Sequence, residues 1–193
     1  MPAPEPSFEL RPKTEPCRAI LAHWQELRGN RLRPTRAEVD PTTLARSLPH
    51  AGLFEVQSLE LTVCQLAGTA FHKSLGFELT GRNVIHIYAP SLHRAAGYRF
   101  LMMATHPCAA MFDMNLSFSI GTQNLHEVML LPLGPNALGV PPALLVGIAA
   151  TGAVDWESTA MLPQASQSPN FRFFDIGAGI PESWPPDDFN ATA

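Results

Sequence analysis

The sequence predicts an α+β domain in which two strands, a group of helices and three further strands follow one another along the chain. Three observations support this. The 193 residues are 46% hydrophobic, enough for a single core. Short apolar, β-branched segments lie on both sides of a helical region. One of them, FDMNLSFSI at 112–120, alternates apolar and polar residues with the period of two that a half-buried antiparallel strand requires.

The first segments of the chain predict a disordered N-terminus over 1–14 and a flanking helix over 15–29. Residues 1–14 are rich in proline and charge. The helix has Pro16 in its first turn and Gly29 as the expected stop. Its apolar residues recur at helical spacing and form one stripe, made of Ile20, Leu21, Trp24 and Leu27. Such a stripe must cover either the chain's own sheet or the surface of a neighbouring molecule.

The next segments predict a short helix and a hairpin. In DPTTLARSLPH, at 40–50, Asp40 is expected to cap a helix that has Pro41 in its first position. AGLFEVQ and LELTVCQLAG, at 51–57 and 59–68, are two apolar segments separated by a polar step, which favours two paired strands. Thr69 is then expected to cap a single helical turn.

A longer helix and three strands complete the predicted order. Ser91 and Pro107 are the expected cap and stop of the helix. FDMNLSFSI, LHEVMLLPL and PALLVGIAAT are the three later strands, and the first of them places on one face Phe112, Met114, Leu116, Phe118 and Ile120. Residues 152–193 are rich in proline and serine and predict a tail, of which FRFFDIG at 171–177 is expected to dock on an edge of the domain.

The charge and composition disfavour several classes of protein. A net charge of −4 disfavours a nucleic-acid binder. No apolar run reaches the roughly 18 residues of a transmembrane helix, and the N-terminal segment lacks the apolar core of a secretory signal. The three cysteines, Cys17, Cys64 and Cys108, have no disulfide or zinc spacing. We therefore expect a cytoplasmic protein with free thiols.

No catalytic or metal-binding motif is present in the sequence. Gly68, Gly76 and Gly81 do not form a phosphate-binding loop and are expected to serve turns and caps. The seven histidines form no zinc motif, and His86 and His93 would be the first candidates for a metal or haem ligand. We expect no metal and no cofactor.

An enzyme remains the alternative from another class, such as a small isomerase or a thioesterase-like protein. Its candidate acids and bases are Asp113, His126 and Glu127. Strand alternation places Asp113 on the polar face of its strand. Glu127 lies on the same strand face as Leu125, Met129 and Leu131, which makes it the best candidate for a buried acid or base.

Three segments together resemble a bacterial PAS-type family of single-domain proteins, long classed as a domain of unknown function. They are LRPTRAEVDPTTLARSLPHAGLFEV, CQLAGTAFHKSLGFELTGRNV and EVMLLPLG, within residues 16–150. The family's P-x-R-x-x-(I/V)-D-P element is matched by Pro34, Arg36, Val39, Asp40 and Pro41, and its LLPH-like start of the first strand by Leu48, Pro49 and His50. Its hallmark, R-L-x-G-T followed by G-x-(D/E)-L-T-G, is matched by Gly68, Thr69, Gly76, Glu78, Leu79, Thr80 and Gly81. Gln65 departs from the hallmark, because an arginine is common at that position.

The resemblance implies a domain over 15–151 with a five-stranded antiparallel sheet and helices inserted between its second and third strands. It implies a stand-alone, non-catalytic sensory or adaptor module that binds a small apolar ligand, a signalling protein, or both. The ligand cavity would lie between the sheet and the helix at 92–103, and its expected lining is Phe71, Met102, Met103, Met114, Phe118 and Met129.

The resemblance also bears on cofactors and assembly. Flavin-binding PAS domains use a cysteine in an N-C-R-F-L-like run, and the nearest segment here, GYRFLMM, lacks it. We therefore expect no tightly held flavin or haem. Flanking helices of PAS-like proteins often pack across a twofold axis, which implies a homodimer through the helix at 15–29.

Overall fold

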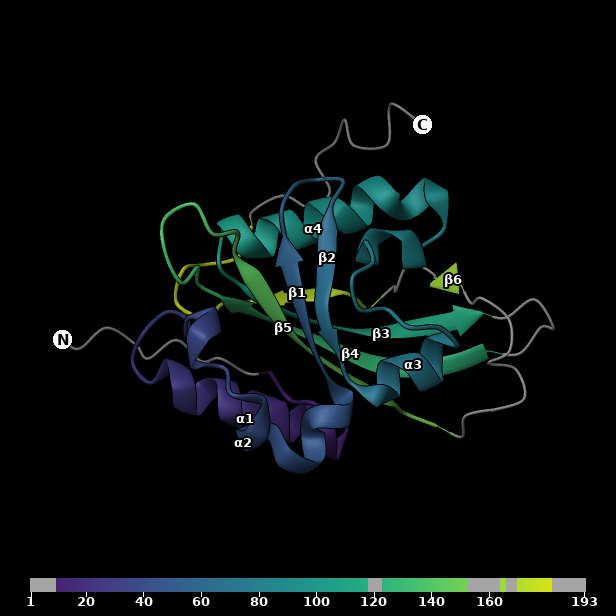
Figure 1. The fold of residues 1–193 in the computed structure, drawn as a ribbon, viewed down its shortest axis with the longest axis horizontal. Coiled ribbons are helices and arrows are strands. Elements are labelled where there is room, and N and C mark those ends of the chain that lie inside the picture. Colours follow the sequence, from purple (N-terminus) through teal and green to yellow (C-terminus); the bar gives the residue numbers. More distant parts are fainter. Residues whose placement is uncertain (1–9, 118–122, 153–163, 166–169, 182–193) are drawn as a thin grey trace.

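The computed structural model describes residues 10–117, 123–152, 164–165 and 170–181. Its centre is an antiparallel sheet with the strand order β2-β1-β5-β4-β3, as Figure 1 shows. The five strands are β1 (Ala51–Val56), β2 (Thr62–Ala67), β3 (Ala109–Ser117), β4 (Gln123–Leu133) and β5 (Ala143–Ala150). The predicted fold class, the five strands and the β1–β2 hairpin are confirmed.

Two short strands extend the sheet beyond β3. They are β6 (Gln164–Ala165) and β7 (Arg172–Phe174), and both pair with β3 in antiparallel orientation. The expected docking of FRFFDIG on an edge of the domain is therefore confirmed, with Ala110 of β3 paired to Phe173. Most of the predicted tail at 152–193 lies outside the described residues.

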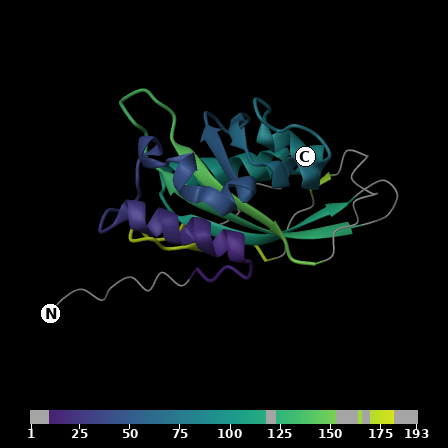
Figure 2. The same ribbon diagram turned by 60° about the horizontal axis from the view of Figure 1, so that its bottom comes forward.

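The helices predicted between the second and third strands cover one face of the sheet, which we call the roof face (Figure 2). They are α3 (Thr69–Leu75), the 3₁₀ turns η3 (Val84–Ile87) and η4 (Pro90–Leu92), and α4 (His93–Thr105). Thr69 is the first residue of α3 and Gly68 its N-cap, one position earlier than expected. Pro90 and Ser91 belong to η4 and Leu92 is the N-cap of α4, so the helix starts one residue later than the sequence indicates.

The opposite face of the sheet, which we call the α1 face, is covered by the N-terminal part of the chain. Its elements are α1 (Glu15–Arg28), η1 (Arg36–Glu38), α2 (Pro41–Leu44) and η2 (Ala45–His50). Asp40 caps α2 as predicted, because its Oδ1 accepts the backbone N–H of Thr42 at 2.8 Å. Trp24 of α1 is fully buried and its Nε1–H donates to the carbonyl oxygen of Pro132 at 3.0 Å. The apolar stripe of α1 therefore covers the chain's own sheet.

Residues 10–14 belong to the folded part of the chain, which corrects their assignment to a disordered N-terminus. Leu10 is buried in the core of the α1 face, together with Ile176 from the segment after β7. Pro12 is also buried. The side chain of Leu10 therefore joins the core of the α1 face before α1 begins. Residues 1–9 of the predicted segment lie outside the described residues.

Strand alternation divides the side chains of β3 and β4 between the two faces. On β3, Phe112, Met114 and Leu116 are buried under the roof, as the period of two predicts. Phe118 and Ile120 of the same pattern lie outside the described residues. On β4, Val128 and Leu130 face the roof, whereas alternate residues face α1 and include Glu127, Met129 and Leu131. No helix among the described residues combines the length and the apolar character that a membrane span needs.

Candidate functional site

A small apolar cavity lies between the roof face of the sheet and the helices above it. Its volume is about 20 Å³, roughly the space that one water molecule needs. The lining includes four phenylalanines, from β1, α3, α4 and β3 in turn: Phe54, Phe71, Phe100 and Phe112. The phenol of Tyr88 is the one polar side chain among the lining residues. The cavity lies between the sheet and the helices, where a ligand site was expected, but its volume is far smaller than the roughly 300–1,000 Å³ of a typical ligand pocket.

Phe54 is the central contact between the sheet and the roof. Its ring meets the ring of Phe71 edge-on, with the centroids 6.0 Å apart, and the ring of Phe100 in the same way at 6.4 Å. Edge-to-face pairs at these distances are favourable beyond the area that they bury. Gly52 gives Phe71 room, because a Cβ at that position would lie 2.8 Å from its Cζ. A single side chain of β1 thus positions both α3 and α4.

The structure separates the six residues that were expected to line the cavity. Phe71 and Met114 line it. Met103 is fully buried in the same core cluster, and Met102 is partly exposed on α4; neither lines the cavity. Phe118 lies outside the described residues.

Met129 is a correction to the expected lining. It is fully buried on the α1 face, in the core cluster that includes Ile20 and Trp24. Its place follows from β4 alternation, because the neighbouring Val128 and Leu130 take the roof-facing positions.

The glycines of the hallmark hold the roof to the edge of the sheet. Gly68 passes so close to η2 that a Cβ there would lie 2.3 Å from the carbonyl oxygen of Leu48. Gly76 ends α3 with φ of 75°, and Gly81 has φ of 81°, a left-handed conformation that glycine adopts readily. The N–H of Gly81 donates to the carbonyl oxygen of Cys64 at 2.7 Å. These positions explain the hallmark by backbone geometry, as expected for turns and caps.

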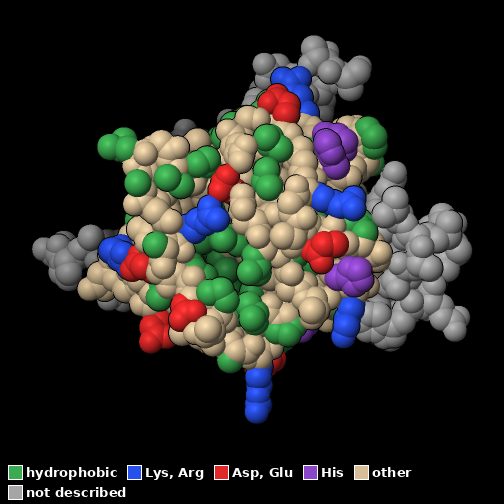
Figure 3. Space-filling view, in the orientation of Figure 1, with side chains coloured by type: hydrophobic (Ala, Val, Ile, Leu, Met, Phe, Trp, Pro, Cys, Tyr) green, Lys and Arg blue, Asp and Glu red, His purple; other side chains and the backbone are tan. Residues whose placement is uncertain are grey.

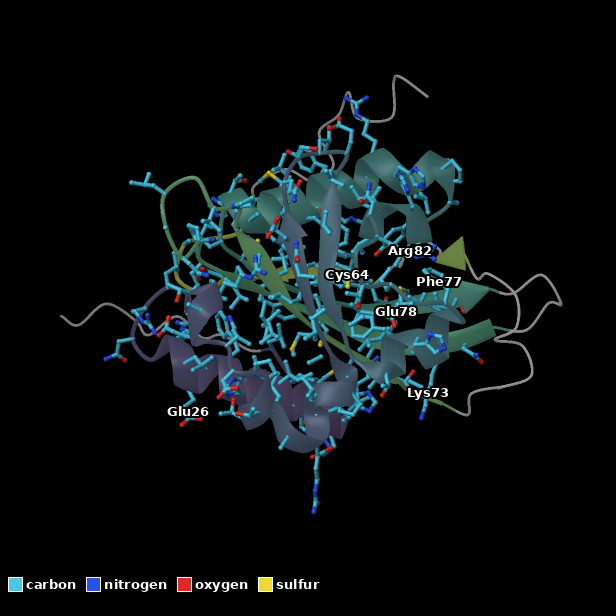
Figure 4. All side chains as sticks on the ribbon, in the orientation of Figure 1. Glu26, Cys64, Lys73, Phe77, Glu78 and Arg82 are labelled. Atoms are coloured by element: carbon cyan, nitrogen blue, oxygen red, sulfur yellow. The ribbon has the colours of Figure 1, made fainter. Side chains whose placement is uncertain are left out.

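The segment after α3 covers the outer edge of β2. The N–H of Cys64 donates to the carbonyl oxygen of Arg82 at 3.0 Å, opposite to the bond from Gly81. The guanidinium of Arg82 lies over the ring of Phe77, 5.1 Å from its centroid, and Figure 4 shows both side chains close to Cys64 and Glu78. The bonds to Cys64 protect part of an edge strand that would otherwise be open to pairing.

Hydrogen bonds of the Asn83 side chain connect the segment after α3 to the β1–β2 turn. Its Oδ1 accepts the N–H groups of Thr62 at 3.1 Å and Ile85 at 3.2 Å, and its Nδ2–H donates to the carbonyl oxygen of Glu60 at 2.7 Å. Sequence reasoning missed this residue. An asparagine directly before an apolar run is a known cap signal, and that signal could have identified it.

A buried polar pair anchors α3 to β4. The Oγ of Ser74 lies 2.8 Å from the Nε2 of His126, and both side chains are buried. The Nδ1 of His126 lies 3.2 Å from the carbonyl oxygen of Asn124. Because a carbonyl only accepts, Nδ1 carries the hydrogen and Nε2 accepts the Ser74 hydroxyl in the neutral ring. Burial lowers the pKa of His126, and its contact with the Asn124 carbonyl offsets part of that effect.

Glu127 holds the start of α1. One carboxylate oxygen accepts the N–H of Lys13 at 2.6 Å, and the other accepts both the N–H and the hydroxyl of Thr14, at 2.9 and 2.6 Å. On the paired strand, Asp113 forms an ion pair with the Nζ of Lys13 at 2.9 Å. The three candidate acids and bases of the enzyme alternative therefore do not converge, because Asp113 and Glu127 face α1 and His126 faces the roof.

The described residues contain no group of three or more histidine, cysteine, aspartate and glutamate side chains arranged to hold a metal ion. The rings of His86 and His93 do come together, with their centroids 5.2 Å apart. The three cysteines are free and buried. Burial raises the pKa of each thiol to about 12, far from the range of a reactive thiolate.

The turn η3 separates the cavity from a groove on the outer surface. Val84 and Ile87 line the cavity. Ile85 and His86 line a groove on the outside. In a 3₁₀ turn, residues three apart point the same way, which places Val84 and Ile87 together on the inner side.

Comparison with known protein families agrees with this architecture. A family model described as a PAS domain matches residues 12–147, which is more than half of the chain. The chain belongs to this PAS domain family. The match begins just before α1 and ends within β5, so the PAS domain comprises the flanking helix, the roof and the five central strands. PAS domains are generally sensory and signalling modules without catalytic activity. No curated protein and no solved structure matched the chain.

Proposed function

We propose that this PAS domain is a non-catalytic sensory or adaptor module whose roofed cavity admits a small apolar molecule and whose output passes to a signalling protein. The supporting observation is the cavity itself. Its lining is apolar apart from the phenol of Tyr88, and it lies where the sheet meets the helices inserted after β2. Free, buried thiols fit a protein of the reducing cytoplasm.

The cavity is too small to admit an organic ligand without a movement of the roof. A space of about 20 Å³ holds no organic molecule, whereas a cavity of about 150 Å³ binds benzene. Entry therefore requires the roof to move away from the sheet. The contacts that would have to adjust include the Phe54–Phe71 ring pair and the Ser74–His126 hydrogen bond, both of which join α3 to the sheet. Ligand binding would thus displace α3, and this displacement is the proposed signal.

The ligand proposal is tested by NMR on protein labelled in its methionine methyl groups, with benzene and indole as probes. Met114 lines the cavity and Met129 lies on the opposite face, so the two methyls are a matched pair. We expect saturable shifts at Met114 and none at Met129. Phe71→Ala enlarges the cavity and should bind benzene more tightly than the native chain. Phe71→Leu replaces it if the alanine variant does not fold.

The outcome that rejects the ligand is equally specific. If Met114 shows no saturable shift in either the native chain or the enlarged variant, the cavity is only part of the core. Shifts of equal size at Met114 and Met129 would indicate general partitioning of the probe into the protein. Either result would remove the ligand from the proposal.

We also propose a homodimer through α1, although the apolar stripe that motivated it packs on the chain's own sheet. The outer side of α1 carries the exposed residues Glu15, Arg18, Gln25 and Glu26. A dimer through α1 would therefore use this polar surface. Light scattering should give the mass of a dimer that Glu26→Arg dissociates. The mass of a monomer at all concentrations would reject the homodimer.

A further inference from the structure

The C-terminal segment 170–177, which we call the strap, lies along the edge of the sheet beside β3. It follows the part of the chain that matches the PAS domain, which ends at residue 147. Its strand β7 pairs with β3 and is the yellow strand that crosses behind β1 and β2 in Figure 1. Phe173 packs on the core of the roof face, whereas Phe174 packs on the core of the α1 face. Alternation along β7 thus attaches the strap to both faces of the sheet.

The cavity comes closest to the surface at the end of η3. Ile87 and Tyr88 are partly exposed there, and the other described residues of the lining are buried. Burial raises the pKa of the Tyr88 phenol to about 12, and the positive charge of Arg99 opposes this rise. The phenol and the guanidinium are therefore close to each other. A molecule that entered the cavity beside Tyr88 would have to pass Arg99.

Arg99 and Phe171 close this side of the cavity together. The guanidinium of Arg99, on α4, lies over the ring of Phe171, 4.4 Å from its centroid, a distance at which the cation and the ring attract each other. The same ring lies 5.2 Å from that of Phe112, which lines the cavity, and 5.0 Å from that of Phe173. Phe171 thus joins the roof to the sheet where the lining is least covered.

The strap is attached more weakly than the elements that it covers. It has three register pairs with β3, at the edge of the sheet, and its aromatic side chains are only partly buried. Ile176 is the one fully buried residue of the strap. A segment with so few buried contacts opens locally at a lower free energy than the core of its domain. Its opening would uncover Phe112 and separate Arg99 from Phe171.

We propose that the strap is the gate of the roofed cavity: an apolar molecule enters beside Tyr88 when the strap leaves β3, and Phe171 closes the entrance afterwards. This inference rests on the proposed function, because it assumes that the cavity admits a molecule. It adds the entrance, which is at the β3 edge, whereas the displacement of α3 provides the room inside. The PAS domain stays folded while the strap is open.

Cys108 is placed to report the opening of the strap. The register of β7 with β3 ends at the pair of Ala109 and Phe174. Cys108 and Asp175 are the next residues on the two segments. Burial raises the pKa of Cys108, and the negative charge of Asp175 adds to this rise. The thiol is fully buried, and departure of the strap would remove the segment that lies beside it.

The first measurement is the rate at which methyl methanethiosulfonate modifies each cysteine, followed by mass spectrometry of peptides. Phe171→Ala should raise the rate at Cys108 about tenfold, because it removes one aromatic pair and one cation–π contact of the strap. Cys17 and Cys64 should keep their native rates, since they lie in α1 and β2. Phe77→Ala is the matched control, because Phe77 also lies under a guanidinium but in the segment that covers the edge of β2.

The second measurement uses a thiol that Met114→Cys places inside the cavity, or Val128→Cys if that variant does not fold, since both residues line the cavity. The reagent labels this thiol when it reaches the cavity, so no stably bound ligand is needed. Phe171→Ala and Arg99→Ala should each raise the labelling rate about tenfold. Arg46→Ala is the control for the second substitution. Arg46 is exposed on η2, where a basic side chain extends into solvent at the bottom of Figure 3.

Three results would overturn the gate. An unchanged rate at Cys108, or an equal rise at all three cysteines, would show that the strap does not open separately from the domain. An equal effect of Phe77→Ala would place the opening elsewhere. A faster rate at Cys108 without faster labelling of the thiol in the cavity would show that the strap opens but is not the entrance. The absence of a benzene shift at Met114 would reject the ligand of the proposed function, and the two labelling rates would still decide the gate.

Discussion

The carboxylate of Glu127 accepts the backbone N–H of Thr14 at 2.9 Å, which joins the middle of β4 to the residue before α1. Thr14 is the N-cap of α1, and its own side chain caps no N–H of the helix. Its hydroxyl instead donates to the same carboxylate at 2.6 Å. The N-terminus of α1 is therefore fixed from the sheet, by a residue more than a hundred positions away in the sequence.

The first prediction concerns this carboxylate. Glu127→Ala should lower the free energy of unfolding by about 2 kcal/mol, because it leaves the partly buried N–H donors of Lys13 and Thr14 without their charged acceptor. Urea unfolding measures the change. Glu26→Ala is the control, because Glu26 is exposed on α1 and points away from the sheet in Figure 4. Equal small effects of the two substitutions would show that Glu127 does not hold the helix.

The second prediction concerns the close approach of α4 to the β1–β2 turn. A Cβ on Gly97 would lie 1.7 Å from the carbonyl oxygen of Leu59, so Gly97→Ala must push the helix away from the turn. We expect a loss of about 3 kcal/mol, as for a severely overpacked core, although alanine favours a helix. Gly134→Ala is the control, since its nearest contact would be an ordinary 3.6 Å. If Gly97→Ala stabilises the domain in thermal unfolding, α4 does not approach the turn so closely.

The third prediction concerns pH. Burial lowers the pKa of His126 below its ordinary value of 6.5. Below about pH 6.5 the unfolded chain therefore binds a proton that the folded chain does not, and acid favours unfolding. The contribution of His126 to the free energy of unfolding is fully present above about pH 6.5. It is lost as the pH falls from there toward the lower pKa of the folded state, by at most about 1.4 kcal/mol for each pH unit.

Unfolding measured between about pH 7.5 and pH 5 checks this third prediction. The native chain should lose stability over this range, and His126→Gln should lose less. His72→Gln, on the surface of α3, should follow the native chain. Identical slopes for all three would contradict a buried, neutral His126.

The fourth prediction concerns the cysteines. Because burial raises each thiol pKa from 9.0 to about 12, the thiolate fraction at pH 8 should fall about a thousandfold. A chromogenic disulfide reagent should leave the native chain unmodified and react with three thiols in urea. Rapid modification of any cysteine in the native state would show that its segment opens readily.

The sequence predicts the strands, the helical insert and the α1 stripe because each depends on local periodicity and on caps close in sequence. Asp40 and its cap, and the alternation of Phe112, Met114 and Leu116, are of this kind. The faces of β4 are different. Both of its faces are apolar, since α1 covers one and the roof the other, so periodicity does not tell which one Met129 joins.

The candidate site was predicted less well for the same reason. The cavity position follows from the order of elements, but its size depends on how the four phenylalanine rings pack. The bonds of Ser74 to His126 and of Glu127 to Thr14 join residues 52 and 113 positions apart. Such pairs are set by strand register and helix placement, which no short sequence motif records.

The turn η3 has a consequence for how this sequence can vary. The first and last of its four residues, Val84 and Ile87, line the interior cavity, whereas His86 lines the outer groove. One inserted or deleted residue would rotate the turn by about a third of a revolution. An imidazole would then enter the aromatic core while an aliphatic side chain took its place outside. The length of this loop is thus as strictly determined as its composition, even though it lies at the molecular surface.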